Sequence, residues 1–84
     1  MTLPPLNGLL ALEATARLQS VSLAARELGI SQPAISQRLR ALVRHFGRTL
    51  IERRPTGFRM DAEVVAFAAR LRTAVQDLGD ASTA

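Results

Sequence analysis

The chain has 84 residues, of which 48% are hydrophobic, carries a formal net charge of +4 and contains no cysteine. This length supports one small domain, and the hydrophobic share is too high for a disordered chain. Without cysteine, neither a disulfide nor a thiolate metal site can form. The only aromatic residues are three Phe, so Leu, Ala, Val and Ile must build the core. Because leucine and alanine favour helix, the sequence predicts a mainly α fold.

The sequence gives no sign of membrane insertion or export. No stretch approaches the roughly 20 apolar residues that span a bilayer. The N-terminus lacks a basic segment, and Pro4 and Pro5 interrupt any signal-peptide core. We therefore expect a cytoplasmic protein with no membrane partner.

The positive charge is concentrated in the middle of the chain. Residues 17–59 hold nine of the eleven arginines and only two glutamates, a local charge of +7, whereas both flanking segments are weakly acidic. A compact basic region between acidic ends favours a polyanionic partner.

Two helices are predicted in the first 28 residues. The first begins after Pro5 and carries an apolar stripe of leucine and alanine as far as Leu18. The second is short and runs over residues 23–28. Ser22 is its predicted N-cap, and Gly29 supplies the left-handed residue that ends it.

A third helix is predicted from Gln32 to about His45. Ser31 is its N-cap, and Pro33 lies in its first turn, where a missing amide donor has no cost. The Gly-Ile-Ser connection between the second and third helices is short enough for a helix-turn-helix. The residues predicted to face the core at helical spacing are Ile35, Leu39, Leu42 and Phe46.

A basic hairpin follows the third helix. Two short strands are predicted at residues 50–53 and 58–60, around turn residues 54–57 that include Pro-Thr-Gly. Arg53, Arg54 and Arg59 make this hairpin a positively charged wing. The sequence thus predicts a winged helix-turn-helix with a small two-stranded wing over residues 1–60.

A fourth, linker helix is predicted over residues 61–79, capped by Asp61, with 80–84 as a loose tail or hinge start. Its apolar residues are spaced 4-3-4-3, which indicates a heptad seam of about two heptads. Such a seam predicts a homodimer; the alternative is that the helix packs back on its own domain. The seam consists of Val64, Ala68, Leu71, Val75 and Leu78.

Three segments of the chain resemble one known family. VSLAARELGISQPAISQRLRAL (21–42) resembles the N-terminal signature of LysR-type transcriptional regulators, and Leu-Ile-Glu-Arg (50–53) is similar to their Leu-Phe-Glu-Arg wing strand. LPPLNGLLALEATAR (3–17) resembles the branch that contains the glycine-cleavage activator and the β-lactamase regulator. Two departures from the family occur. Val43 stands where most members carry Glu, and after the wing Asp61 replaces a Thr and a valine replaces a Gly.

The resemblance implies an assembly and further domains. The family dimerises through the linker helix, and full-length members are usually tetramers with a C-terminal effector-binding domain. That domain lies outside this sequence, so we expect either a fragment, which we favour, or a natural short paralogue. A short paralogue could act by forming mixed dimers with a full-length regulator.

The candidate site residues are those that would contact DNA. The second helix of a helix-turn-helix enters the major groove N-terminus first, so Gln32 can pair with adenine and Pro33 can contact a thymine methyl. The resemblance implies the same use for Ser36 and Gln37 one turn later, whereas the arginines can bind guanine or phosphate. The full predicted set is Ser22, Ser31, Gln32, Pro33, Ser36, Gln37, Arg38, Arg40, Arg44, Arg53, Arg54 and Arg59.

Two other classes of function were weighed. An enzyme is disfavoured because the only histidine, His45, lies at a helix C-terminus, and because the sequence has no carboxylate cluster for a metal and no glycine-rich phosphate loop. No catalytic residue, metal or cofactor is therefore expected. The second alternative is a winged helix that binds another protein. Such a module would carry apolar residues on the outward face of the third helix, where this chain has Gln37, Arg40 and Arg44.

Overall fold

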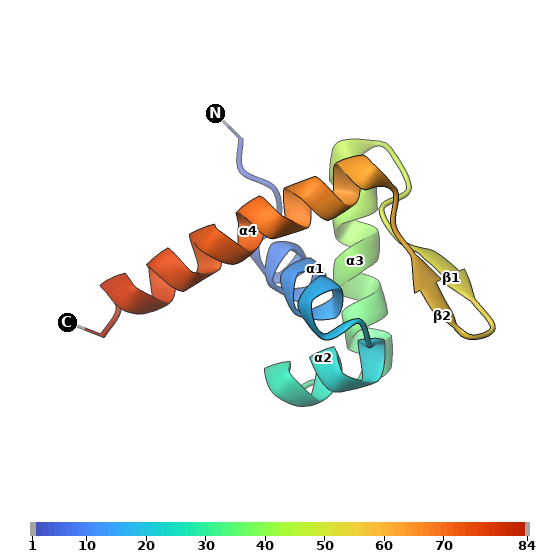
Figure 1. Cartoon of the computed structure of the whole chain (residues 1–84), viewed down its shortest axis with the longest axis horizontal. Helices are drawn as coiled ribbons and strands as arrows, with labels where there is room; N and C mark the ends of the chain where they lie inside the picture. Colours follow the sequence, from blue (N-terminus) through green and yellow to red (C-terminus); the bar gives the residue numbers. More distant parts are fainter. Residues whose placement is uncertain (1, 84) are drawn as a thin grey trace.

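The computed structural model describes residues 2–83, which form four helices and one antiparallel hairpin (Figure 1). In chain order the elements are α1 (Leu6–Leu18), α2 (Val21–Leu28), α3 (Gln32–Phe46), β1 (Glu52–Arg54), β2 (Gly57–Arg59) and α4 (Ala62–Ala81). The first three helices form a bundle, the hairpin lies beside α3, and α4 packs across α1. This architecture confirms the predicted mainly α, winged helix-turn-helix fold.

Helix α1 is the centre of the molecule and contacts each of the other three helices. Its Leu12 is fully buried and belongs to the same apolar core as Ile35 and Leu42 of α3. Gly8 allows α1 to approach α3 closely. A Cβ atom at this position would lie 2.7 Å from Leu42 Cγ and 2.8 Å from the carbonyl oxygen of Arg38.

The start of α2 corrects the sequence prediction. Ser20, and not Ser22, is the N-cap, and its hydroxyl accepts a hydrogen bond from the Leu23 amide at 3.0 Å. The helix begins earlier than predicted because Val21 is buried in the core as its first residue, which leaves Ser22 exposed within the first turn. Gly29 ends the helix with φ 68°, as predicted.

Helix α3 begins as predicted and extends one residue further. The Ser31 hydroxyl caps it by accepting a hydrogen bond from the Ala34 amide at 3.2 Å, and Gly47 ends it with φ 69°. The prediction that Phe46 faces the core is wrong, since this residue is 40% exposed. Because α1 begins beside the preceding turn of α3, Phe46 lies past the core and packs edge-on against Phe67 of α4.

The wing is a three-residue hairpin, shifted from the predicted strands at 50–53 and 58–60. Leu50 is buried in the core and therefore precedes the strand instead of starting it. Two residues, 55 and 56, form the turn, and Gly57 opens the second strand with φ 113°, a conformation that suits glycine. The paired residues are Glu52 with Arg59, Arg53 with Phe58, and Arg54 with Gly57.

Helix α4 begins at its predicted cap but ends later than expected. The Asp61 carboxylate accepts a hydrogen bond from the Val64 amide at 3.0 Å. At the other end the helix continues through Gly79 to Ala81, so part of the predicted loose tail is helical; Ala84 lies outside the described residues. This half of α4 projects away from the bundle (Figure 1), so local helix preference decides its end, and one glycine costs only about 1 kcal/mol.

Candidate nucleic-acid interface

The N-terminal turns of α3 present polar side chains to solvent. Gln32 and Pro33 are exposed in the first turn, Gln37 is exposed one turn later, and Ser36 is half-buried beside it. The Ser31 hydroxyl is occupied as the helix cap. An exposed carboxamide donates and accepts hydrogen bonds together, which is what the major-groove edge of adenine requires.

Two arginines extend this face, and one predicted arginine does not. Arg40 and Arg44 are exposed and continue the outward side of α3. Arg38 is half-buried, and it lies about 200° around the helix from Arg40 because each residue turns an α-helix by about 100°. Its carbonyl oxygen lies next to Gly8 of α1. The structure therefore does not bring Arg38 together with the other predicted DNA-contacting residues of α3.

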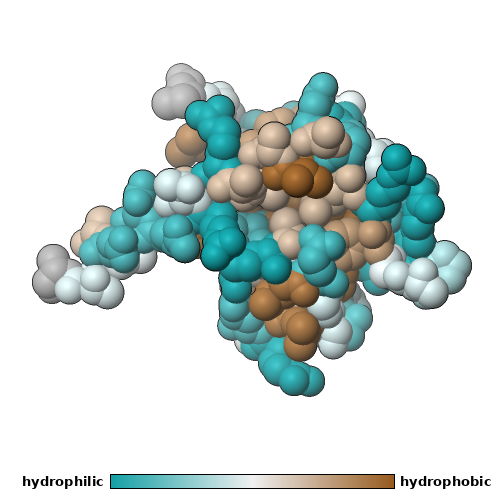
Figure 2. All heavy atoms as spheres, in the orientation of Figure 1, coloured by the Kyte–Doolittle hydropathy of each residue, from teal (hydrophilic) through white to brown (hydrophobic). Residues whose placement is uncertain are grey.

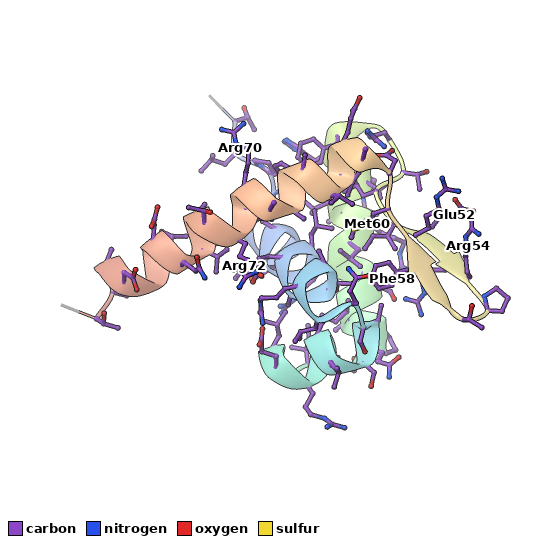
Figure 3. The ribbon with its side chains drawn as sticks, viewed as in Figure 1. Glu52, Arg54, Phe58, Met60, Arg70 and Arg72 are labelled. Atoms are coloured by element: carbon purple, nitrogen blue, oxygen red, sulfur yellow. The ribbon has the colours of Figure 1, made fainter. Side chains whose placement is uncertain are left out.

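The three wing arginines are divided between two faces of the hairpin. Directly opposed residues of an antiparallel pair share a face. Arg53 is therefore on the face of Phe58, which points toward the helices, whereas Glu52 and Arg54 lie on the outer side (Figure 3). On that outer side the Arg54 guanidinium lies 3.4 Å from the Glu52 carboxylate, and Arg59 is opposite Glu52.

The start of α2, the start of α3 and the wing meet around one hollow. Ser22, Gln32, Arg53 and Arg54 all line this hollow, which has a volume of about 290 Å³. Ser22 was predicted as a cap and as a DNA contact; it is not the cap, but it does lie with the other predicted contacts. The structure thus gathers predicted residues from three elements on one side of the molecule.

An ion-pair cluster that the sequence analysis missed fixes α2 against α1. Arg17 donates to Glu13 one turn earlier, with Nε 2.7 Å from Oε2, and also pairs with Glu27 of α2. Glu13 is only 6% exposed. Hydrogen bonds from Arg17 lower the pKa of Glu27, and the two carboxylates raise that of Arg17. The i, i+4 spacing of Glu13 and Arg17 was the available signal, but the partner on α2 lies ten residues away in sequence.

A second cluster joins the start of α4 to the segment that follows α3. Arg48 pairs with Asp61 and, at 3.0 Å, with Glu63. The pKa of Asp61 is lowered, first by the hydrogen bond from the Val64 amide and then by Arg48. The sequence identified Asp61 as a cap but not its link to Arg48, so the structure adds a contact that orients the linker helix.

The predicted heptad seam is divided along α4. Val64 and Ala68 are 3% and 6% exposed because they pack against their own chain, which is the alternative that the sequence left open. Leu71 also packs against this core. Val75 is half-buried and Leu78 is 56% exposed. Within the seam, exposed apolar surface therefore begins at the half-buried Leu71 and increases toward Leu78.

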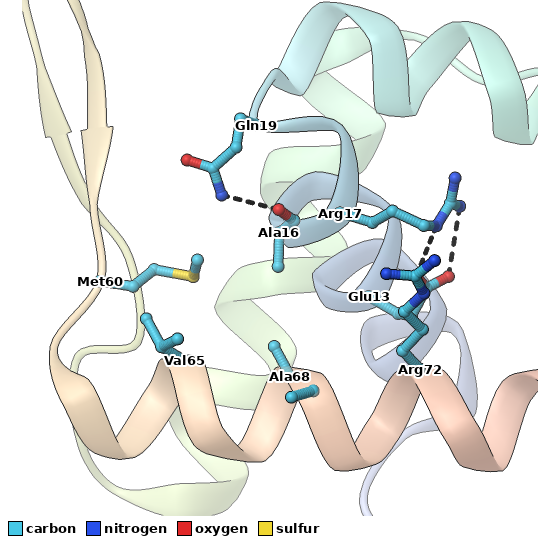
Figure 4. A pocket seen from close by; sticks show the side chains of 9 residues that line it. Glu13, Ala16, Arg17, Gln19, Met60, Val65, Ala68 and Arg72 are labelled. Carbon is cyan, nitrogen blue, oxygen red and sulfur yellow. Dashed lines mark hydrogen bonds and ion pairs between the residues drawn. The ribbon is translucent and has the colours of Figure 1, made fainter.

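An apolar hollow lies between α1 and α4, next to that seam. It has a volume of about 190 Å³, and its wall includes Ala16, Met60, Val65 and Ala68 (Figure 4). Val65 is 51% exposed. Figure 2 shows apolar residues gathered over the centre of this face, with hydrophilic side chains around them. This is the face of the described residues that offers apolar area beside the projecting end of α4.

The described residues offer neither a metal site nor a membrane span. No group of three or more His, Cys, Asp or Glu residues within 2–83 could hold a metal ion. Nor does any helix in this range have the length and apolar character needed to cross a membrane. His45 lies at the C-terminal end of α3, with its ring 5.0 Å from that of Phe46.

The fold and its exposed α3 face define the class of protein: a winged helix-turn-helix DNA-binding domain. Residues 6–63 match the family of bacterial regulatory helix-turn-helix proteins called the lysR family. The chain belongs to this family, whose members are transcription regulators and not enzymes.

Relatives and solved structures agree with this assignment. The chain is 44% identical over 70 residues to the transcriptional activator AmpR of Citrobacter koseri, covering 83% of this chain and 25% of AmpR. It is 36% identical over 77 residues to a carbapenem-hydrolysing β-lactamase transcriptional activator of Serratia marcescens, covering 92% and 26%. The structure superposes on the DNA-binding domain of CbnR in a DNA complex with TM-score 0.79 and 28% identity, covering 94% and 91%. The chain thus spans about a quarter of the length of the two activators, AmpR and the β-lactamase activator of Serratia marcescens.

Proposed function

We propose that this chain binds double-stranded DNA sequence-specifically as a homodimer, with α3 in the major groove at each half of an interrupted palindrome. The observation that carries the proposal is the outward face of α3, which presents Gln32, Pro33, Gln37 and Arg40 and contains no acidic residue. Amide and guanidinium groups on a groove-sized helix suit base edges and phosphates. The likeness to the CbnR domain that was solved with DNA supports this docking.

The side chains divide into two roles. Gln32 and Gln37 contact base edges, Pro33 contacts a thymine methyl, and Ser36 contacts a base edge or phosphate. Arg44 and the wing arginines bind phosphate, which sets affinity and register without selecting sequence. Ser22 lies in the first turn of α2, where backbone amides suit a phosphate.

Dimerisation in this proposal uses the projecting end of α4. Val64 and Ala68 remain in their own core, while Leu71, Val75 and Leu78 contact the partner's helix and the hollow that includes Val65. A two-fold axis between the linker helices spaces the two α3 helices for half-sites about one turn of DNA apart. In a full-length regulator we propose that this module works within a tetramer that carries an effector domain, in the cytoplasm.

The test is selection of bound DNA from a randomised duplex pool, followed by sequencing. We expect an interrupted palindrome. Replacing Leu71→Arg buries like charges across the two-fold axis, so this variant should sediment as a monomer and select a half-site only. Thr73→Arg, on the exposed side of the same helix, is the matched control and should behave like the wild type.

Two outcomes would contradict the proposal. If no motif is recovered and binding vanishes at moderate salt, the basic surface acts only as a polycation, and the protein-interaction alternative takes its place. If Leu71→Arg still sediments as a dimer, the dimer interface lies elsewhere on the molecule.

A further inference from the structure

A hollow separates α3 from the wing, and two arginines border it. It has a volume of about 150 Å³. Apolar side chains from α3 and the segment before β1 form most of its wall, and the polar atoms belong to Ser36, Arg40 and Arg53. The residues that carry the argument are Ser36, Leu39, Arg40, Val43, Ile51 and Arg53.

Neither of the two arginines at this hollow pairs with a carboxylate of the described residues. Within residues 2–83, neither Arg40 nor Arg53 lies within 4.0 Å of a carboxylate. Arg54 differs, because the Glu52 carboxylate lies 3.4 Å from it on the outer face of the wing. Arg53 is therefore the wing arginine that is free of a counter-charge and placed next to α3.

Val43 forms part of the apolar floor of the hollow. It is half-buried and packs against the core between Arg40 and the wing. A carboxylate at this position would neutralise an adjacent arginine. With valine, the hollow keeps an apolar floor and two uncompensated positive charges. Low-dielectric walls of this kind strengthen the field of nearby charges.

We propose that this hollow binds one deoxyribose-phosphate unit of the DNA backbone, with the phosphate between Arg40 and Arg53 and the sugar against Leu39, Val43 and Ile51. The inference rests on the proposed function, which brings α3 to DNA, and adds a backbone site that depends on Val43. A phosphate held by two guanidinium groups accepts several charge-assisted hydrogen bonds. A deoxyribose ring has an apolar face that matches the floor of the hollow. The site fixes the wing relative to α3 on the DNA.

The first test introduces a carboxylate into the floor of the hollow. Val43→Glu should weaken binding to both the selected operator and a random duplex by about tenfold, since a charge beside a phosphate site opposes binding regardless of sequence. It should also reduce the slope of log Kd against log salt by about 0.9, which corresponds to one phosphate contact. Val43→Gln has the same size without the charge and should bind nearly as the wild type does. Thr73→Glu places the same charge on the exposed side of α4, outside the proposed dimer contacts, and is the control for net charge.

The second test asks whether Arg40 and Arg53 bind the same phosphate. If they do, the losses from Arg40→Ala and Arg53→Ala will not multiply in the double variant, and their coupling should exceed about fivefold. Arg54→Ala combined with Arg40→Ala should show independent effects. This comparison of single and double variants still tests the site if Val43→Glu fails to fold, which circular dichroism would reveal.

The outcomes separate the two proposals. Equal affinities for Val43→Glu and Val43→Gln, or multiplicative losses for Arg40 and Arg53, would overturn the backbone site even where the wild type selects a palindrome. A wild type that selects no sequence would overturn the proposed function instead. Expected effects in both tests, on a wild type that selects its operator, would support the site.

Discussion

The close approach of α1 to α3 at Gly8 makes a sharp prediction about stability. In Gly8→Ala the added Cβ would meet Leu42 Cγ at 2.7 Å and the Arg38 carbonyl oxygen at 2.8 Å. The leucine can change rotamer, but the carbonyl belongs to the backbone of α3. One of the two helices must therefore move by several tenths of an ångström, which disturbs a core that includes the fully buried Leu12 and Leu42.

Two opposing terms decide the magnitude. Alanine improves helix propensity by about 0.8–1.0 kcal/mol relative to glycine. Overpacking a well-packed contact costs about 1–3 kcal/mol. The difference between the two terms is a net loss of up to about 2 kcal/mol in the free energy of unfolding, and we expect a value near 2 because the clash involves backbone, which cannot change rotamer. In a domain of this size each kcal/mol corresponds to a fall in Tm of about 4–8 °C.

The assay is urea unfolding followed by circular dichroism, at one fixed protein concentration because dimerisation would couple stability to concentration. Gly79→Ala is the matched control, since no atom lies within 4 Å of a Cβ at that position of α4. Gly79→Ala should leave the free energy of unfolding unchanged or raise it by up to about 1 kcal/mol. A Gly8→Ala variant as stable as the wild type would refute this prediction, because it would show that α1 and α3 can move apart at their crossing without loss of stability.

Two further predictions concern α2. Ser20→Ala should lower the free energy of unfolding by about 1 kcal/mol because it removes the helix cap. Ser22→Ala changes an exposed position inside the helix and should alter that free energy by less than about 0.5 kcal/mol. Urea unfolding midpoints of the two variants check this, and equal losses would place the cap elsewhere. The pKa of Glu27 is lowered in the folded state by its hydrogen bond to Arg17, so the stability from this pair is present above the ordinary carboxyl pKa of about 4.3 and is lost as the pH falls through the folded-state value. Unfolding at pH 7 and pH 3 should therefore show a smaller acid-induced loss for Glu27→Gln than for the wild type; identical losses would mean that the pair adds nothing.

The features of α3 show what local sequence could predict. Ser31 and Pro33 act within one turn of their own positions, and each has the predicted role. The core-facing residues also follow, because a period of 3.6 residues places them on one side. Phe46 obeys the same period and is nevertheless exposed, since the extent of the core depends on where α1 begins beside α3.

In the candidate site, too, some placements followed from local sequence and others depended on the tertiary structure. Exposed residues on the outward face of α3 were predictable from spacing, and the structure places Gln32, Gln37 and Arg40 there. The placement of Arg53 and Arg54 on opposite faces was not predicted, because the sequence put Arg54 in the turn, whereas β1 extends through Arg54. Successive residues of a strand point to opposite faces.

Periodicity, caps and turn residues act over a few neighbouring positions, and they were enough to predict four helices, the wing and the basic face. Contacts between distant segments decided the rest: the Arg17 bridge to α2, the Arg48 bridge to α4, the register of the hairpin, and the burial of Val64 and Ala68 within their own chain. An apolar seam has the same pattern whichever surface covers it. Only the packing therefore determined which part of α4 is buried within this chain and which part stays exposed.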